Sequence, residues 1–562
     1  MKNNAFFITL LSFVFLIMSQ NAFAQASTQG TDFYVAFGRN LTSFGNTIVY
    51  QIRIVASQVA DVTLTFKADS TLNDSIHLNA GEVYTYNLNT AQKAGVYSSS
   101  TATSNKSLRI QSTTPVSVYA LNQTRGSADA TNVFPVNTLG TEYYHFSYQP
   151  SSQPDSYLVI ATENDTEVYE GATLRATLDA GQVYSYADAG TTDLTGRHIT
   201  SNYPVAYFVA TDQVLLPAGT TYLECLFQQM VPVNTWGKNF LVPVTHRGLE
   251  RVRIIASQDN TQVTQTGGTI QLNLGAASLT LNAGQFVELE ISLANGGCYI
   301  TANKPVGVAS YLVGASYSGL TVTKGDPALG WIPPIEQTIS STVIAPFVPT
   351  SAGNTVMDEH HALIVTAKAT RSQTRLAIGT NPPTLLSGGT WTDGPANSNG
   401  SNYSFYSLQL TNDTSSYFFT NSNGLFVLGY GLGYVSGWGE SYYYLAGASA
   451  RLLSAALYVN GTPCQDNDNL IFCGSPQNIS FEANLQNAQS STPGYLKWYI
   501  DNTEEISERD NEQWSKTLSR GIYLIRMEVL DVEDQWHTIS ATITVSPCVI
   551  PVNPHLRSYF GN

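Results

Sequence analysis

Charged residues are scarce in this chain, and basic ones are the scarcer kind. Only 12% of the 562 residues are Asp, Glu, Lys or Arg, and 41 acids against 26 bases give a formal net charge of −15. No stretch gathers Lys and Arg on the scale that contacts with nucleic acid phosphates require. The composition therefore argues against a nucleic acid partner.

Cysteine is also rare. The chain has five, namely Cys225, Cys298, Cys464, Cys473 and Cys548. They are few for a disulfide scaffold, and none stands in a C-x-x-C pair of the kind that holds zinc or works in thioredoxin-like sites. An odd number leaves one cysteine unpaired within the chain. We expect one disulfide between Cys225 and Cys298, and one between Cys548 and either Cys464 or Cys473.

Long apolar runs are missing beyond the first residues. Ala5 to Met18 is apolar and follows Lys2, and Ala22-Phe23-Ala24 offers the small-x-small pattern of a cleavage site. A run of about 14 residues is shorter than the roughly 20 that a membrane-spanning helix needs. We therefore expect residues 1–24 to be a signal peptide and the mature, exported chain to begin near Gln25 without a membrane span.

Helical periodicity is nearly absent as well. Segments rich in β-branched and aromatic residues alternate with Asn, Gly, Pro and Asp, and the abundance of Gly, Thr, Ser, Asn and Tyr is typical of extracellular β-structure. The roughly 540 residues after the signal are too many for one hydrophobic core. The sequence predicts an all-β protein with several domains.

A repeat organises residues 45 to 450. The first repeated phrase is a strand leading to a turn, and its copies are IRIVASQ from Ile52, YLVIATENDTEV from Tyr157, VRIIASQDNTQV from Val252 and, more loosely, ALIVTAKATRSQTRL from Ala362. The second is LNAGEVYTY from Leu78, LDAGQVYSY from Leu178 and LNAGQFVEL from Leu281. Its Ala-Gly pair predicts a hairpin turn with a positive φ at Gly81, Gly181 and Gly284.

The third repeated phrase is a strand that we expect a proline to open. Its copies are IQSTTPVSVY from Ile110, ITSNYPVAYF from Ile199 and ITANKPVGVA from Ile300, with GLFVLGYGLG from Gly424 in the matching place. Gly81, Gly181 and Gly284 lie 100 and 103 residues apart, so one unit has about a hundred residues. We expect about four tandem β-sandwich-like units over residues 25–450, with a propeller-like closed ring as the alternative.

Residues 451–549 follow another pattern, and 550–562 form a tail. Four strands are indicated, by NISFEANL from Asn478, YLKWYIDN from Tyr495, GIYLIRMEVLD from Gly521 and TISATITV from Thr538, and Trp498 is a candidate core residue. This pattern predicts an immunoglobulin-like or polycystic-kidney-disease-type β-sandwich.

Five connecting segments resemble the N-terminal domain of the IgGFc-binding protein family. They are GTDFYVAFGRN (30–40), FPVNTLGTEYY (134–144), DLTGRHITSNYPVAYF (193–208), QQMVPVNTWGKNFLVPV (228–244) and GDPALGWIPPIEQ (325–337), and they cover about 30 to 440 in order. The resemblance implies a protein or glycoprotein partner, immunoglobulin Fc or mucin. The family's animal member carries cysteine-dense repeats that this chain lacks, and the difference favours a bacterial secreted or cell-surface protein.

These segments also have a structural interpretation. Pro135, Pro232 and Pro333, with Gly140 and Gly237, are typical of crossover loops that fix one unit against the next. Trp236 fits the same role. As an alternative, its indole ring could serve as a contact for the ligand.

Candidate chemistry is sparse. GASYSG from Gly314 is one residue out of register with the G-x-S-x-G nucleophile motif, and nothing selects a pair of acids for glycoside hydrolysis. Asp358, Glu359, His360 and His361 form the densest set of ligand-type residues. Neighbouring residues on a strand point to opposite faces, so both histidines could serve one metal only from a loop, and a solvated loop is our interpretation. We predict no metal site and no cofactor.

Calcium is the more reasonable ion for an acidic extracellular β-protein, because hard oxygen ligands from Asp, Asn and carbonyl groups are plentiful. QDNDN (465–469) resembles the start of an EF-hand loop but lacks its Gly and closing Glu. The pairs Asn164-Asp165 and Asp259-Asn260 recur at the same turn of two units, which favours turn chemistry over coordination.

Three functions remain in competition. The leading hypothesis is an adhesin-like binding protein, not an enzyme, at the cell surface or outside the cell; its 32 tyrosines suit a contact surface. The second is a structural component of a bacterial surface assembly. The third, less favoured, is a carbohydrate-active enzyme.

Overall fold

The computed structural model describes residues 28–41, 48–273, 279–348, 357–387, 389–435, 438–449, 454–464, 468–486, 493–530 and 536–546. The chain divides into two compact units, Ala26–Leu452 and Leu453–Asn562, near the predicted division at residue 450. We call them the repeat domain and the C-terminal domain. The expected signal peptide lies outside the described residues. Within the described part, no helix has the length and apolar character that crossing a membrane requires.

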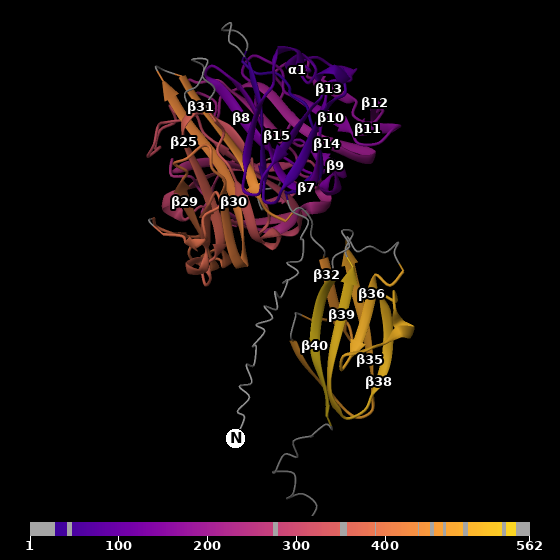
Figure 1. Cartoon of the computed structure of the whole chain (residues 1–562). Coiled ribbons are helices and arrows are strands. Elements are labelled where there is room, and N and C mark those ends of the chain that lie inside the picture. Colours follow the sequence, from indigo (N-terminus) through magenta and orange to yellow (C-terminus); the bar gives the residue numbers. More distant parts are fainter. Residues whose placement is uncertain are drawn as a thin grey trace, which may run out of the picture. The chain divides into compact units, whose positions relative to one another are not determined.

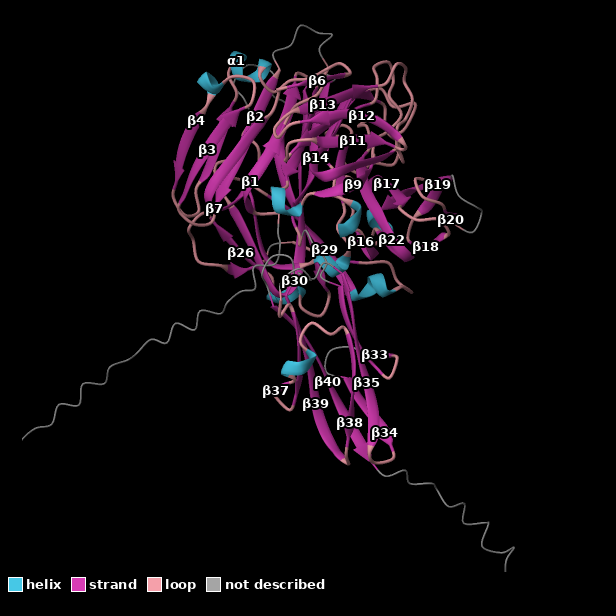
Figure 2. Cartoon of the chain, turned by 90° about the vertical axis from the view of Figure 1, so that its right-hand side faces the viewer, coloured by secondary structure: helices cyan, strands magenta, loops and turns pink. Residues whose placement is uncertain are grey.

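The fold is all-β, as predicted, and Figure 2 shows strands throughout both domains. The described residues contain one short α-helix, α1 (Thr90–Ala94). The 3-10 helices are η1 (Ser70–Leu72), η2 (Val136–Thr138), η3 (Val233–Thr235), η4 (Leu293–Asn295), η5 (Ile335–Gln337), η6 (Arg371–Gln373), η7 (Asn399–Asn402) and η8 (Ile506–Glu508).

Four successive sheets, each with seven or eight strands, define four repeat units. Unit 1 has β1 (Gly30–Val35), β2 (Val49–Ala56), β3 (Ala60–Phe66), β4 (Asp74–Leu78), β5 (Val83–Asn87), β7 (Leu108–Thr124) and β8 (Ser127–Val133). Unit 2 has β9 (Gly140–Tyr144), β10 (Ser156–Ala161), β11 (Thr166–Glu170), β12 (Thr173–Leu178), β13 (Val183–Ala187), β14 (His198–Val214) and β15 (Glu224–Gln229), with β6 (Ala102–Ser104) added at its edge.

The other two units repeat this order. Unit 3 has β16 (Gly237–Val242), β17 (Leu249–Ala256), β18 (Thr261–Thr266), β19 (Thr269–Asn273), β20 (Thr280–Leu281), β21 (Phe286–Ser292), β22 (Cys298–Leu312) and β23 (Ala328–Trp331). Unit 4 has β24 (Ile339–Ile344), β25 (Met357–Ala367), β26 (Arg375–Ile378), β27 (Thr384–Leu385), β28 (Thr392–Asp393), β29 (Tyr403–Gln409), β30 (Tyr417–Val435) and β31 (Trp438–Gly447).

A single long strand connects two layers in each unit. In unit 1 the first part of β7 pairs with β3 and β1, and its later part pairs with β2 and β8. β14, β22 and β30 change partners in the same way. Each unit is therefore sandwich-like, as predicted, with the long strand shared by both layers.

The repeated proline lies within this long strand instead of opening it, which corrects the prediction. Pro115, Pro204 and Pro305 stand inside β7, β14 and β22. The register with the paired first strand shifts at this place, between Thr200 and Val205 in unit 2, for example. A proline has no N–H to donate, so a break in the ladder is where a strand tolerates it.

The turns follow the predicted chemistry. Gly81, Gly181 and Gly284 have φ values of 80°, 79° and 78°, which confirms the positive φ expected at the Ala-Gly hairpins. The Asn and Asp of the first phrase also work in turns: Ala180 N donates to Asn164 Oδ1 at 3.1 Å, and Ala283 N donates to Asp259 Oδ1 at 3.0 Å. These side chains thus join two turns of one unit and do not need an ion.

Crossover loops fix each unit against the next through proline–glycine contacts. A Cβ added to Gly140 would lie 2.5 Å from Pro232 Cβ, and one added to Gly237 would lie 2.4 Å from Pro334 Cβ. Gly30 lies against Pro135 in the same manner. The proline that precedes η5 is therefore Pro334, one residue after the Pro333 that we predicted.

The four units close into a ring. The last strands of the units, β8, β15, β23 and β31, contact one another in cyclic order, so unit 1 packs against unit 4 as well as unit 2. In Figure 1 the labels of β31, β8 and β15 stand next to one another in the upper part of the repeat domain. Tyr119 of unit 1 donates its hydroxyl to Val343 O of unit 4 at 2.7 Å. The units are sandwich-like and their arrangement is the closed ring.

Two buried side chains connect all four units where these strands meet. Asp129 of β8 accepts from Phe227 N at 3.0 Å, and from Leu329 N and Tyr443 N at 3.3 Å each. Gln228 Nε2 of β15 donates to the carbonyl oxygens of Ala130, Leu329 and Tyr443 at 2.7–2.9 Å. One acceptor group and one donor group thus satisfy backbone atoms of β8, β15, β23 and β31.

The C-terminal domain is a two-sheet sandwich, as predicted. One sheet has the order β33-β32-β35-β38 and the other β34-β40-β39-β36-β37. Its strands are β32 (Ser454–Val459), β33 (Thr462–Cys464), β34 (Asp468–Cys473), β35 (Gln477–Gln486), β36 (Leu496–Ile500), β37 (Thr503–Glu504), β38 (Gln513–Leu518), β39 (Gly521–Leu530) and β40 (Trp536–Ser546). Trp498 is fully buried in its core, which confirms the prediction for that residue.

Candidate functional site

A pocket of about 520 Å³ lies where loops and strands of three repeat units meet. Unit 2 contributes Tyr222 from the loop between β14 and β15, and unit 4 contributes Asp358 of β25 and Tyr434 of β30. Unit 3 contributes Ala315, Ser316, Thr323 and Lys324, all from the loop between β22 and β23. GASYSG is part of this loop, so it forms the wall of a pocket and not a nucleophile elbow.

Two tyrosines form the aromatic part of this pocket. A hydrogen bond between the hydroxyls of Tyr222 and Tyr434 raises the pKa of Tyr222. Tyr434 remains 45% exposed, and Thr221 N donates to Ser316 Oγ at 3.0 Å, which ties the unit 2 loop to the unit 3 loop. The pocket is therefore lined by tyrosine and serine hydroxyl groups, and a hydrogen bond connects two of its loops.

The charged residues of the pocket are already paired. Lys324 Nζ lies 2.5 Å from Asp358 Oδ1 and 3.4 Å from Glu359 Oε2. An ammonium and a carboxylate held together in this way neutralise each other. The pocket consequently offers polar groups for recognition, and its Lys324 and Asp358 are paired with each other.

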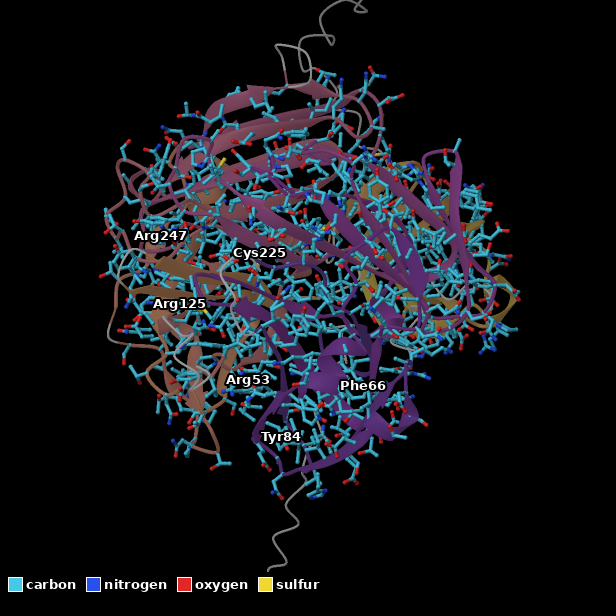
Figure 3. All side chains as sticks on the ribbon, turned by 90° about the horizontal axis from the view of Figure 1, so that it is seen from above. Arg53, Phe66, Tyr84, Arg125, Cys225 and Arg247 are labelled. Carbon is cyan, nitrogen blue, oxygen red and sulfur yellow. The ribbon has the colours of Figure 1, made fainter. Side chains whose placement is uncertain are left out.

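Buried charges lie close to the pocket. Asp326, in the segment that follows its lining loop, is completely buried, and burial raises its pKa. Burial lowers the pKa of Arg247 to about 10, and its Nη1 donates to Val313 O at 2.6 Å. Figure 3 labels Arg247 and Cys225 among the side chains of the repeat domain.

Next to the pocket, two imidazoles converge on one carboxylate oxygen. His246 Nε2 lies 3.0 Å from Glu359 Oε1, and His361 Nε2 lies 2.8 Å from the same oxygen. The two imidazole rings are 4.4 Å apart between centroids. His246 belongs to the turn between β16 and β17, whereas Glu359 and His361 belong to β25, so the cluster bridges units 3 and 4.

Electrostatics keep this cluster neutral at its rings and charged at its carboxylate. Burial lowers the pKa of His361 to about 4 and also lowers the pKa of His246. For Glu359, burial alone would raise the pKa, but the hydrogen bond with His361, the two imidazoles and the Lys324 ammonium together outweigh it and lower the pKa. At neutral pH the two histidines are therefore uncharged and Glu359 is ionised.

The sequence had singled out two of the three residues of this cluster, Glu359 and His361. His360 and His361 lie in strand β25, so the interpretation of a solvated loop was wrong. The two side chains do point to opposite faces: His360 Nδ1 lies 2.9 Å from Tyr442 OH, whereas His361 faces His246. No spacing pattern could have found His246, because only the contact between units 3 and 4 brings it to β25.

Trp236 does not present a ligand surface. It is only 3% exposed, its ring centroid lies 6.0 Å from that of Trp331 and 5.7 Å from that of Tyr144, and its Nε1 donates to Val231 O at 3.3 Å. The structure contradicts the ligand-contact alternative, because the indole is buried among Tyr144, Phe146 and Trp331.

The predicted central disulfide is absent from the structure. Cys225 lies in β15 of unit 2 and Cys298 in β22 of unit 3, and both are buried free thiols. Burial raises the pKa of each thiol, which makes these thiols inert. The prediction was wrong because cysteines of neighbouring repeats occupy separate sheets. The expected bond between Cys548 and either Cys464 or Cys473 remains a prediction, since Cys548 lies outside the described residues.

A serine, a histidine and an aspartate, the residue types of a catalytic triad, lie together in the interior of unit 2. His145 Nε2 lies 3.1 Å from Asp155 Oδ1, and Ser147 Oγ donates to that same oxygen at 2.9 Å. All three side chains are completely buried, and His145 Nδ1 contacts Tyr207 OH at 2.6 Å. The serine thus hydrogen-bonds to the aspartate instead of the imidazole, and this network stabilises the core of unit 2.

The possible calcium segment QDNDN (465–469) is only partly described. Its residues 465–467 lie outside the described part of the chain.

Comparisons with known proteins agree on one family. The family model described as IgGFc binding protein matches residues 129–431, more than half of the chain. The IgGFc-binding protein of Homo sapiens is 28% identical over 246 residues, which are 40% of this chain and 4% of the human protein. The chain thus spans only a small part of that relative.

The solved structures that match the chain are more distant in sequence. Fibronectin(III)-like modules of Clostridium thermocellum CbhA are 11% identical, with 37% of this chain and 94% of that chain covered and a TM-score of 0.13. Mouse cadherin-23 EC22-24 is 11% identical, with coverages of 60% and 96% and a TM-score of 0.13. TM-scores this low support no conclusion about fold or function.

Proposed function

Because the chain belongs to the IgGFc-binding protein family, we propose that it is an exported binding protein whose repeat domain recognises a protein or glycoprotein partner. The human relative is named for the Fc part of immunoglobulin G, which makes Fc the first candidate partner and mucin the second. The signal-like first 24 residues support export.

The pocket shared by units 2, 3 and 4 is the observation that carries this proposal. Its lining combines two tyrosines with hydroxyl groups and a paired Lys and Asp, the mixture that protein-binding loops commonly use. Tyrosine supplies a large contact area and loses little conformational freedom on binding. A neutralised ion pair at the same place adds hydrogen-bonding groups without a net charge.

Binding of the purified full chain to immobilised immunoglobulin G, its Fc fragment, enzymatically deglycosylated Fc, mucin and deglycosylated mucin tests the proposal. We expect saturable binding to Fc, and a dissociation constant about tenfold higher for Tyr434→Ala, because tyrosine is enriched among the few interface residues whose truncation costs over about 1 kcal/mol. Tyr434 is 45% exposed, so the substitution leaves the core intact.

A matched control is Tyr203→Ala, since Tyr203 is 43% exposed but does not line the pocket. Equal losses for both variants would contradict the placement of the ligand. Binding to mucin that vanishes on deglycosylation would replace Fc by a glycan as the partner. Absence of binding to every probe would contradict the proposed function and favour a structural role in a surface assembly.

A further inference from the structure

The cluster of His246, Glu359 and His361 has the arrangement of a metal site. Its three ligand atoms, two Nε2 and one carboxylate oxygen, all lie within 4.8 Å of one another. The side chains of His246 and Glu359 are 28% and 21% exposed, so an ion has a path to the cluster from solvent. His361, at 8%, forms the inner wall.

Each imidazole contacts a hydroxyl group through its second ring nitrogen, Nδ1. His246 Nδ1 lies 2.8 Å from Tyr430 OH, and His361 Nδ1 lies 3.4 Å from Ser407 Oγ. Tyr430 OH and Ser407 Oγ are themselves hydrogen-bonded at 2.6 Å, and the ring of His361 stacks on that of Tyr430 at 4.8 Å. Metal-bound histidines nearly always have such a partner at the second ring nitrogen, because it fixes the tautomer and the ring orientation.

These hydroxyls suit either tautomer of the histidines. A hydroxyl both donates and accepts, so it accepts from Nδ1–H when Nε2 carries a lone pair toward an ion. The same side chains then keep their positions with and without a bound metal. The orientation of both Nε2 atoms toward Glu359 Oε1 is consequently built into the fold.

We propose that His246, His361 and Glu359 bind a divalent transition-metal ion of the zinc class, in a site that joins units 3 and 4. Two imidazole nitrogens and one carboxylate oxygen form a ligand set that zinc prefers, whereas calcium and magnesium require mostly oxygen ligands. In this structure the cluster is closed by hydrogen bonds, with Nε2 to Oε1 distances of 2.8 and 3.0 Å.

Binding of an ion would require the hydrogen-bonded ligand atoms to separate. Bonds of about 2.0–2.2 Å to a tetrahedral ion separate neighbouring ligand atoms by roughly 3.3–3.5 Å. The two Nε2 to Oε1 distances, now 2.8 and 3.0 Å, therefore have to lengthen by a few tenths of an ångström, and all three ligand atoms already lie within 4.8 Å of one another. The fourth coordination position then remains for water or for a group of a partner.

Lys324 does not compete for this position. Its Nζ contacts Glu359 Oε2 at 3.4 Å, which is not the oxygen that the imidazoles approach, and its close partner is Asp358 at 2.5 Å. Asp358 balances the charge of Lys324, so the negative charge of Glu359 remains for a cation. The ion pair of the pocket and the metal site are thus neighbours with separate partners.

Metal binding to the untagged full chain tests the proposal. After removal of metal with a chelator, the chain is titrated separately with Zn²⁺, Co²⁺, Ca²⁺ and Mg²⁺ by calorimetry, and its thermal unfolding is recorded with each ion. We expect one Zn²⁺ per chain, a higher Tm with Zn²⁺, intense visible absorption of the tetrahedral kind with Co²⁺, and no comparable effect of Ca²⁺ or Mg²⁺.

Glu359→Gln and His246→Ala should each weaken Zn²⁺ binding at least tenfold and abolish the rise in Tm. The matched control is His198→Ala, because His198 Nε2 also lies 2.8 Å from a glutamate oxygen, that of Glu142, but has no second imidazole. Zinc binding that the control weakens as much as His246→Ala would overturn the proposal. Wild-type chain that retains no zinc after equilibration and dialysis would overturn it as well, whatever the variants do.

Discussion

Glu250 is a buried acid of β17 that depends on two donors. Thr245 N donates to its Oε1 at 2.6 Å and Ser310 Oγ donates to its Oε2 at 2.6 Å. Burial nevertheless dominates and raises the pKa of Glu250 to about 7. The folded chain therefore keeps the proton at pH values where the unfolded chain, with an ordinary glutamate pKa, has already released it.

The sign of the resulting pH dependence follows from proton counting. Between about pH 4.5 and pH 7 the folded state binds more protons at Glu250 than the unfolded state, so this residue's contribution to the free energy of unfolding falls as pH rises. The contribution is complete below about pH 4.5 and is lost above about pH 7. Glu250→Gln has no proton to lose, and its amide can accept from Thr245 N and donate to Ser310 Oγ.

We expect the difference in the free energy of unfolding, Glu250→Gln minus wild type, to grow by up to about 3 kcal/mol from pH 5 to pH 8. Urea denaturation at several pH values measures it. The control is Glu82→Gln, which introduces the residue that units 2 and 3 carry as Gln182 and Gln285. A constant difference for Glu250→Gln, or an equal slope for the control, would contradict this account of Glu250.

Local residue chemistry was predictable, and long-range placement was not. Gly81, Gly181 and Gly284 were found because a tight turn leaves its requirement for a positive φ in the sequence itself. Asp129 and His246 left no such pattern, since their partners are backbone amides or side chains of other units. Trp236 was ambiguous for a related reason: an aromatic residue in a loop fits a core and a binding surface equally well.

Crossover segments fix the position of each repeat unit against the next unit. Each begins with a proline that packs on the glycine opening a first strand, in the pairs Gly30 with Pro135, Gly140 with Pro232 and Gly237 with Pro334. The glycines are thus required by close approach, not by their φ. The sequence predicted the role of these segments because proline and glycine recurred in them at matching places.

Gly237→Ala should lower the free energy of unfolding of the repeat domain by about 1–3 kcal/mol, because the new methyl group forces β16 away from the segment before η5. Its Cβ would lie 2.4 Å and 2.6 Å from Cβ and Cγ of Pro334. Chemical denaturation measures the change.

The control is Gly190→Ala, whose Cβ would have Asp188 Oδ2 at 3.7 Å as its nearest neighbour. We expect this variant to differ from wild type by less than about 0.5 kcal/mol. Similar losses for the two variants would show that the general backbone effect of replacing glycine, and not the contact with Pro334, decides the result.

The prediction of where the long strands begin was wrong. β7, β14 and β22 continue through Pro115, Pro204 and Pro305, although a proline inside a strand normally argues for its start or its end. The strand survives because its pairing partners change at that place. Such a change is a property of the sandwich as a whole, so periodicity along one segment could not indicate it.

Closure of the ring is the feature of the whole molecule that sequence could not decide. Sandwich units in series and in a ring have the same alternation of buried and exposed residues. Contacts such as that of Asn132 Nδ2 in unit 1 with Leu445 O in unit 4, at 3.0 Å, distinguish the two arrangements. They join segments about 300 residues apart, where no local pattern operates. The ring in turn brings loops of units 2, 3 and 4 to one pocket.

Hydrogen exchange of the full chain with and without saturating immunoglobulin G Fc tests the central claim, recognition at this pocket, most directly. The account predicts slower exchange on Fc addition in three segments, around Tyr222, from Ala315 to Lys324 and around Asp358, with no change in the C-terminal domain. Unchanged exchange in all three segments at saturating Fc, or protection confined to other parts of the chain, would contradict it.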